Sequence, residues 1–157
     1  MSPPVLSVVI PTRNRREDLQ RTLAALDRQR GLPGPFEVIV SDDGSTDATP
    51  EYLSSRPRFA SFSIKSLRLT GKGPATARNR AIAAASAPRV LLLGDDTAPD
   101  EGTLALHASE GRGNRGVQGR IEWDPEAPVT SVMEFLAPAG PQFYFKNLED
   151  GGPIPYT

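Results

Sequence analysis

Two pairs of adjacent aspartates, Asp42-Asp43 and Asp95-Asp96, are the residues of this sequence best suited to chemistry. Each pair follows an apolar run typical of a buried strand, FEVIV before the first pair and VLLLG before the second. Adjacent side chains at a strand end diverge, so they make a poor general acid and base pair. They suit a hard divalent cation, which prefers oxygen ligands and which a diphosphate can help to coordinate.

An acidic turn is the alternative explanation for each pair, because Asp, Gly, Ser and Thr are common turn residues. One pair alone would favour the turn, whereas two pairs after strands of one sheet favour a binding site. For Asp43, two interpretations stay open. The segment is an acidic Asx-turn with Asp47 as a helix cap, which is expected for Ser45 and Asp47 in either case, or Asp43 is also a carboxylate at the sheet edge that could accept a hydrogen bond from a base imide N–H.

The elements that must position these residues alternate between strand and helix. Strands are predicted at 6–10, 36–40, 62–69 and 89–93, and helices at 14–30, 47–53 and 75–87. Runs without alternation, 89–93 among them, are expected to be covered on both faces, and the alternating segment 62–69 to lie nearer an edge. The sequence therefore predicts an α/β fold with a mostly parallel central sheet and helices on both faces.

Ligands of parallel sheets bind at the carboxyl ends of the strands, near the reversal in strand order. Thr12 and both aspartate pairs follow strands and are expected to meet there. Arg15 and Arg16 are expected to be solvated residues of the first helical turn. His107, the only histidine, is expected on a helix surface, because it has no partner at a metal-ligand spacing.

The segment after Asp100 is less regular. A helix at 104–110 and a strand at 117–121 are predicted, and residues 126–157 are rich in proline, glycine and aromatic residues. We therefore expect a ligand-binding domain over 1–125, followed by a tail over 126–157 that begins a further region.

The composition excludes several classes of protein. The charge is balanced, with 18 basic and 19 acidic residues, so no global field favours a nucleic acid partner. The chain has no cysteine, which excludes disulfides and thiolate metal sites. No secretory signal or apolar run of about 20 residues is present, so no membrane span is expected. We expect a cytoplasmic protein, or one peripheral to the inner face of the membrane.

Four segments together resemble the nucleotide-binding part of the family 2 glycosyltransferases, which have the Rossmann-like GT-A fold. They are SVVIPTRNR, VIVSDDGSTD, GPATARNRAIAAA and VLLLGDD, in the order and spacing of that family. The resemblance covers about residues 5–125. It implies a metal-dependent transferase that moves a sugar, with inversion, from a nucleoside diphosphate sugar to an acceptor hydroxyl. UDP-sugar is the favoured donor, Mn²⁺ or Mg²⁺ the metal, and a glycan, lipid or small molecule the acceptor.

The resemblance also implies the roles of individual residues. Asp96 would be the metal ligand of a DxD-like motif, with Asp95 beside it at the metal and the sugar or ribose. Thr12 and Asp43 would contact the nucleoside. The full set expected to bind the nucleotide is Pro11, Thr12, Asn14, Asp42, Asp43, Arg78 and Asp95.

Two departures from the family pattern limit what the resemblance implies. Gly94 stands where many members have the first aspartate of D-x-D, so Asp95-Asp96 must serve. Glu149-Asp150 is not expected to be the catalytic base, which stays unassigned, and residues 1–157 are expected to bind donor without transferring it. The alternatives are a non-catalytic nucleotide-sugar-binding module and a sugar nucleotidyltransferase, although the latter would carry a glycine-rich loop after its first strand.

Overall fold

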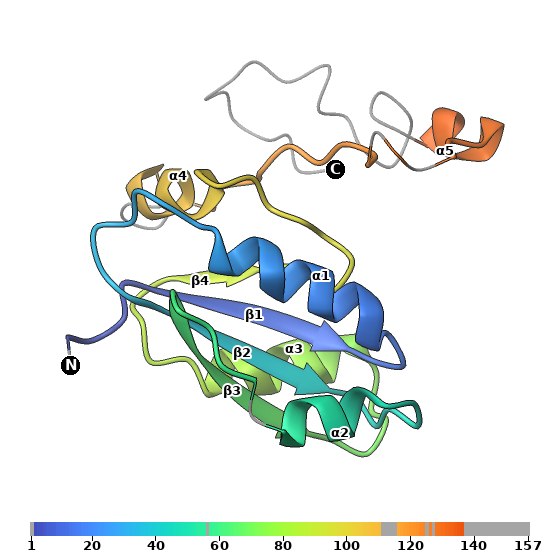
Figure 1. Ribbon diagram of the computed structural model, residues 1–157, viewed down its shortest axis with the longest axis horizontal. Helices are drawn as coiled ribbons and strands as arrows, with labels where there is room; N and C mark the ends of the chain where they lie inside the picture. Colours follow the sequence, from blue (N-terminus) through green and yellow to red (C-terminus); the bar gives the residue numbers. More distant parts are fainter. Residues whose placement is uncertain (1, 56, 111–115, 125, 127, 137–157) are drawn as a thin grey trace. The chain divides into compact units, whose positions relative to one another are not determined.

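The computed structural model describes residues 2–55, 57–110, 116–124, 126 and 128–136 of the 157. The chain divides into two compact units, Met1–Val117 and Gln118–Thr157. The first unit alternates strands and helices from β1 to α4 (Figure 1). In the described part of the second unit, one helix is formed, α5 (Ser131–Leu136).

The first unit contains a four-stranded parallel sheet. Its strands are β1 (Leu6–Thr12), β2 (Phe36–Asp42), β3 (Phe62–Arg68) and β4 (Val90–Leu92), in the spatial order β3-β2-β1-β4. In the ladder register, Thr12 pairs with Asp42 and Asp42 with Arg68, so three strands end level with one another. The predicted mostly parallel α/β fold is confirmed, and the strand order reverses between β1 and β4.

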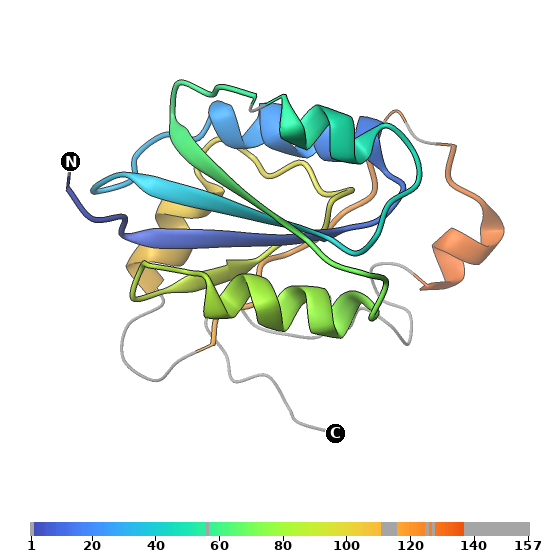
Figure 2. The same ribbon diagram turned by 90° about the horizontal axis from the view of Figure 1, so that it is seen from below.

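Helices cover both faces of this sheet. They are α1 (Arg16–Asp27), α2 (Thr49–Ser54), α3 (Pro74–Ala83) and α4 (Thr103–Glu110). Figure 2 shows α1 and α2 on one face and α3 on the other. Side chains alternate along a strand, so successive residues face opposite sides of the sheet. Val8 and Val38 pack under α1 and α2, whereas Val9 and Ile39 pack with Ala81 of α3.

The edges of the sheet agree with one expectation and contradict another. The alternating strand β3 lies at an edge, as predicted. The run 89–93 was expected to be covered on both faces, but β4 is short and Val90 and Leu92 are 38% and 51% exposed. Both side chains share the α3 face of the sheet, and α3 packs on β1 and β2. An edge strand beyond the reach of that helix is therefore left partly open to solvent.

The segment 117–121 forms no strand, contrary to prediction. Val117 and Ile121 are 41% and 44% exposed, so no sheet buries their apolar side chains. Short alternation does not make a strand without a partner to complete the hydrogen-bonded ladder. Among the described helices, none is long and apolar enough to cross a membrane.

Candidate functional site

The reversal in strand order brings Thr12 and Asp95 together. Thr12 is the last residue of β1, and Asp95 follows β4 after Leu93, whose N–H donates to the Val9 carbonyl at 3.0 Å. Thr12 Oγ1 donates to Asp95 Oδ2 at 2.8 Å, and the two residues are only 3% and 8% exposed. This buried bond joins the two strands that flank the reversal, the place where parallel sheets bind ligands.

The backbone of Asp95 is fixed by helix α1. Thr22, in the middle of that helix and 1% exposed, donates its hydroxyl to the Asp95 carbonyl at 2.9 Å. Burial raises the pKa of the Asp95 carboxyl, while the Thr12 bond and the charge of Arg15 act in the opposite direction. The first aspartate of the second pair is thus a rigid, partly desolvated group.

Asp96 is exposed and pairs with Arg15. Its side chain is 58% exposed, and Arg15 Nη1 lies 2.7 Å from Asp96 Oδ2 and 3.5 Å from Asp95 Oδ1. The hydrogen bond to Asp96, together with the charge of Asp95, raises the pKa of Arg15. Arg15 was expected to be solvated, but the β1–α1 turn directs it at the acid pair. Arg16 is solvated as expected, 3.9 Å from the exposed Glu17.

Gly94 leaves room for the Asp96 carboxylate. A Cβ placed on Gly94 would lie 2.7 Å from Asp96 Oδ1 and 3.0 Å from Thr97 Oγ1. Any side chain at this position would therefore displace the carboxylate. The glycine that departs from the D-x-D pattern allows Asp96 to fold back over the backbone.

The carboxylate of Asp43 anchors the loop between β3 and α3. Its Oδ1 accepts from the Lys72 N–H and its Oδ2 from the Gly73 N–H, each at 2.8 Å, and the residue is 3% exposed. Gly44 permits this contact: its φ is 76°, and an added Cβ would lie 3.0 Å from the Gly71 nitrogen. Each carboxylate oxygen keeps a second lone pair, so Asp43 can accept a hydrogen bond from a further donor while it holds the loop.

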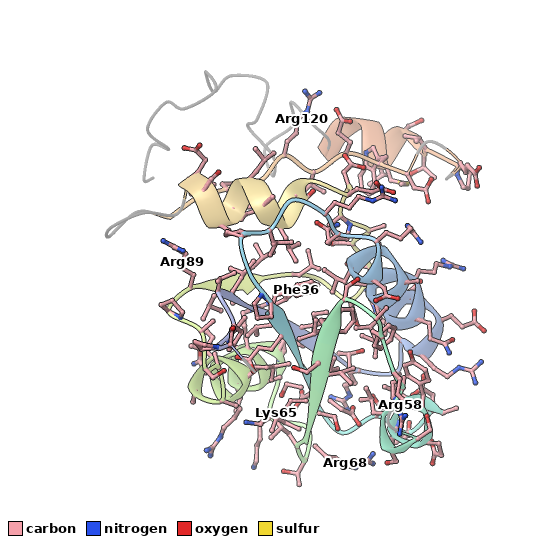
Figure 3. The ribbon with its side chains drawn as sticks, turned by 60° about the vertical axis from the view of Figure 1, so that its left-hand side comes forward. Phe36, Arg58, Lys65, Arg68, Arg89 and Arg120 are labelled. Atoms are coloured by element: carbon pink, nitrogen blue, oxygen red, sulfur yellow. The ribbon has the colours of Figure 1, made fainter. Side chains whose placement is uncertain are left out.

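Asp42 is a turn residue held by two partners. Its Oδ1 accepts from the Ser45 N–H at 2.8 Å, and its Oδ2 lies 3.3 Å from Arg68 Nη1. Figure 3 labels Arg68 at the end of β3. Asp47 accepts from the Thr49 N–H at 2.9 Å, at the start of α2. The expected turn is therefore present, but the expected cap by Asp47 is not: the N-cap of α2 is Ala48, which makes no side-chain cap hydrogen bond, and Asp47 lies one residue before it.

Asn14 connects the β1–α1 turn to the β2–α2 loop. Its φ of 54° lies in the left-handed region, which Asn tolerates better than most residues. Its side-chain oxygen accepts from the Thr46 N–H at 2.7 Å, and its own N–H donates to Ser45 Oγ at 2.9 Å. Asn14 thus holds two loops of the carboxyl end together.

The two remaining predicted site residues are Pro11 and Arg78. Pro11 is half-buried in β1, and Arg78 is half-buried in α3, the helix whose amino end follows the loop held by Asp43. Glu149 and Asp150 fall outside the described residues.

Sequence reasoning missed the roles of Arg15 and Thr22. The position of Arg15, three residues after the strand that supplies Thr12, was the available signal. A buried threonine on the apolar face of α1, where a larger aliphatic residue would be expected, was the signal for Thr22.

The comparisons with known proteins agree on one family. The model of "Glycosyl transferase family 2" matches residues 7–126. Validoxylamine A glucosyltransferase of Streptomyces hygroscopicus subsp. limoneus is 44% identical over 151 residues, which are 94% of this chain and 33% of the relative. Poly(ribitol-phosphate) beta-N-acetylglucosaminyltransferase TarS of Staphylococcus aureus is 31% identical over 98 residues, 62% of this chain and 17% of TarS. The chain thus spans about a third of the Streptomyces relative.

Solved structures show the same fold. S. aureus TarS 1-349 in complex with UDP-GlcNAc aligns with a TM-score of 0.57 at 26% identity, covering 73% of this chain and 37% of that one. A mannosyltransferase of Pyrobaculum calidifontis in complex with GDP-Man and Mn²⁺ aligns with a TM-score of 0.56 at 27% identity, covering 67% and 31%.

Proposed function

This chain belongs to glycosyl transferase family 2 and has the GT-A fold, and from that premise we propose that it binds a nucleoside diphosphate sugar, with UDP-sugar favoured, for metal-dependent, inverting transfer to an acceptor hydroxyl. Within this proposal, residues 1–125 are the donor-binding domain and 126–157 begin the acceptor side. The catalytic base is not assigned to any residue of the chain.

One observation carries the proposal. Asp95 is buried against Thr12 at the reversal in strand order, with the exposed Asp96 beside it. This places one rigid and one accessible carboxylate where a parallel sheet binds its ligands.

The acid pair fits Mn²⁺ or Mg²⁺ by its chemistry and by its present contacts. Both groups are carboxylates, the ligands that hard cations prefer, and one guanidinium nitrogen already reaches both. Among the described residues there is no group of three or more His, Cys, Asp and Glu side chains that could hold a metal, so diphosphate oxygens and water would complete the coordination. A bound divalent cation would act as a Lewis acid that stabilises the leaving diphosphate.

The residues of the chain divide the remaining work. We propose Asp96 as the direct metal ligand, because its carboxylate is accessible, and Asp95 as its partner at the metal and the donor sugar or ribose. Thr12 and Asp43 would contact the nucleoside, with Asp43 using the lone pairs that the loop amides leave free. The other residues proposed to line the nucleotide are Pro11, Asn14, Asp42 and Arg78.

The names of the similar proteins suggest which donors to test. The Streptomyces relative is named a glucosyltransferase, TarS was solved with UDP-GlcNAc, and the Pyrobaculum enzyme with GDP-Man. We propose UDP-glucose as the first donor, because the glucosyltransferase matches 94% of this chain. Its acceptor is proposed to be a hydroxylated small molecule, with a glycan or lipid acceptor as the alternatives.

A calorimetric titration of UDP into the chain, with and without Mn²⁺ and with GDP as competitor, tests the proposal. UDP is expected to bind more tightly with Mn²⁺, and Asp96→Ala is expected to remove that difference. Asp100→Ala, a nearby exposed aspartate outside the acid pair, is the matched control and should retain it. Failure of the folded chain to bind either nucleotide contradicts the proposal. Metal-dependent binding of UDP without transfer to any acceptor, by this chain or by any longer chain that contains it, would favour the non-catalytic binding module.

A further inference from the structure

Arg15 supplies the positive charge nearest to the acid pair. A single nitrogen, Nη1, lies 2.7 Å from Asp96 Oδ2 and 3.5 Å from Asp95 Oδ1. The guanidinium therefore bridges the two carboxylates proposed as metal ligands. Arg16, the next residue, instead lies 3.9 Å from Glu17.

The acid pair needs such a charge. Asp95 is 8% exposed and directly precedes Asp96, so two carboxylates lie close together and one of them has little water around it to screen the repulsion. Arg15 Nη1, 3.5 Å from Asp95 Oδ1, offsets this repulsion with a positive charge. It also binds the Asp96 carboxylate that folds back over Gly94.

The contact between Arg15 and the acid pair is nevertheless open to solvent and can be broken. Its side chain is 50% exposed and its stronger partner, Asp96, is 58% exposed. Ion pairs this accessible contribute little to stability, since water and salt screen them. A guanidinium released at this position would face the same end of the sheet and could donate two parallel hydrogen bonds to a phosphate.

We propose that Arg15 is the resident counter-cation of Asp95 and Asp96: it holds the pair while no divalent cation is bound, competes with the metal for it, and turns to the diphosphate of the donor once displaced. This inference rests on the proposed function. It makes Arg15 a positioning residue that sets metal affinity and links metal binding to donor binding.

The test is Mn²⁺ binding by the 157-residue chain, measured by electron paramagnetic resonance without nucleotide. Arg15→Gln removes the competing charge and is expected to tighten Mn²⁺ binding about 2- to 5-fold, the range expected for one exposed ion pair. Arg15→Lys keeps the charge and should bind Mn²⁺ like the wild type. Arg16→Gln is the matched control, because that arginine does not pair with Asp95 or Asp96, and it too should behave as wild type.

A second measurement follows the released guanidinium. With saturating Mn²⁺, Arg15→Gln is expected to bind UDP about 10-fold more weakly, since a charge-assisted hydrogen bond to phosphate is lost. Tighter binding of Mn²⁺ together with weaker binding of UDP distinguishes this role from a simple loss of structure, which would weaken the binding of both ligands.

The outcomes separate the two proposals. Unchanged or weaker Mn²⁺ binding by Arg15→Gln, in a wild type that binds Mn²⁺, overturns the role of Arg15 alone. Equal effects of Arg15→Gln and Arg15→Lys also overturn it, because the charge would then not be the cause. Absence of Mn²⁺ binding by the wild type, even with UDP, overturns the proposed metal site and the role of Arg15 with it.

Discussion

The two aspartate pairs have the same sequence and different environments. Asp42 and Asp43 are both buried, and their carboxylates accept from backbone amides: Asp42 from Ser45 of its own turn, Asp43 from the loop between β3 and α3. In the second pair, Asp95 is buried against Thr12 while Asp96 is accessible. The first pair therefore organises the carboxyl end of the sheet, and only the second combines a fixed carboxylate with an open one.

Replacing Asp43 should weaken nucleotide binding through the loop that it holds. In Asp43→Asn, the side-chain amide keeps one acceptor and presents a donor to the second loop N–H, so one hydrogen bond becomes unfavourable. Hydrogen exchange at Lys72 and Gly73 should accelerate, and UDP affinity should fall to a similar degree with and without Mn²⁺. Asp96→Asn is the contrasting variant. Its Lys72 and Gly73 amides should exchange as slowly as in the wild type, and Mn²⁺ should no longer increase its affinity for UDP. A loss of UDP affinity in Asp43→Asn confined to Mn²⁺ would instead assign Asp43 to the metal site.

Gly44→Ala should destabilise the fold by about 1–3 kcal/mol. The residue has a φ of 76°, and a Cβ would lie 3.0 Å from the Gly71 nitrogen, so backbone strain and a steric contact add. Urea unfolding of the variant measures the loss. Gly102→Ala is the control, because no atom lies within 4 Å of its added Cβ and its φ is not positive. Equal stability of the two variants would show that the Gly44–Gly71 contact does not constrain the loops.

Side chains connect the loops at the carboxyl end of the sheet to one another. Asn14 joins the first loop to the second, Asp43 joins the second to the third, and Thr12 with Asp95 joins β1 to the segment after β4. Elements linked in this way need little ordering when a ligand binds, so less of the binding free energy is lost to entropy.

A separate cluster joins the elements at the amino end. Glu37, the second residue of β2, accepts hydrogen bonds at Oε1 from Ser7 Oγ of β1 and from the N–H and Oγ of Ser86, after α3. Lys65 of β3, labelled in Figure 3, also donates a hydrogen bond from its side chain to the Ala84 carbonyl at the end of α3. These contacts fix α3 and the start of β4 against the sheet.

Glu37 should make stability depend on pH in the acid range. Burial alone would raise the pKa of Glu37, but the hydrogen bonds from Ser7 and Ser86 outweigh it and lower the pKa. A lowered pKa in the folded state contributes stability above the ordinary glutamate value, and that contribution is lost as pH falls through the folded-state pKa. Glu37→Ala should therefore lower the free energy of unfolding by about 1–3 kcal/mol at pH 7, and by progressively less below about pH 4.3.

Urea unfolding of the wild type and Glu37→Ala between pH 7 and pH 3 measures this dependence. Glu101→Ala removes an exposed glutamate paired with Arg30 and should cost less than about 1 kcal/mol at each pH. A difference between wild type and Glu37→Ala that is constant over this pH range would exclude the carboxylate as its source.

The sequence predicted the elements better than their surroundings. Apolar runs identified the four strands, because the pattern of apolar residues that marks a strand can be seen within the strand itself. The ends of those strands then identified the residues that meet at the carboxyl end of the sheet, Thr12 and Asp95 among them. The exposure of Leu92 was not predictable, since the run VLLLG is equally apolar whether or not a helix covers it. The Asp43 anchor was not predictable either, because the Lys72 and Gly73 amides that it binds have no signature in side-chain sequence.

At the scale of the whole molecule, the site draws on every strand of the sheet. Thr12 comes from β1, Asp42 and Asp43 from the end of β2, Arg68 from β3, and Asp95 from the segment after β4. The chain is nearly neutral, with a net charge of −1, so affinity for an anionic donor must come from local groups rather than from a global field. Ligand binding should therefore be coupled to the folding of the whole first unit.

This coupling predicts a shift in thermal stability. A ligand that binds only the folded state, present at 100 times its dissociation constant, stabilises the fold by about 2.7 kcal/mol. For a chain of this size, that is an increase in Tm of about 5–11 °C with UDP and Mn²⁺ together. Because the loops are joined by side chains, one cooperative transition should move as a whole, as followed by circular dichroism and calorimetry. Asp96→Ala should lose the part of the shift that depends on Mn²⁺ and keep the part due to UDP alone. A second transition that does not move with ligand, arising within residues 1–117, would show that the loops at the carboxyl end unfold independently of the sheet.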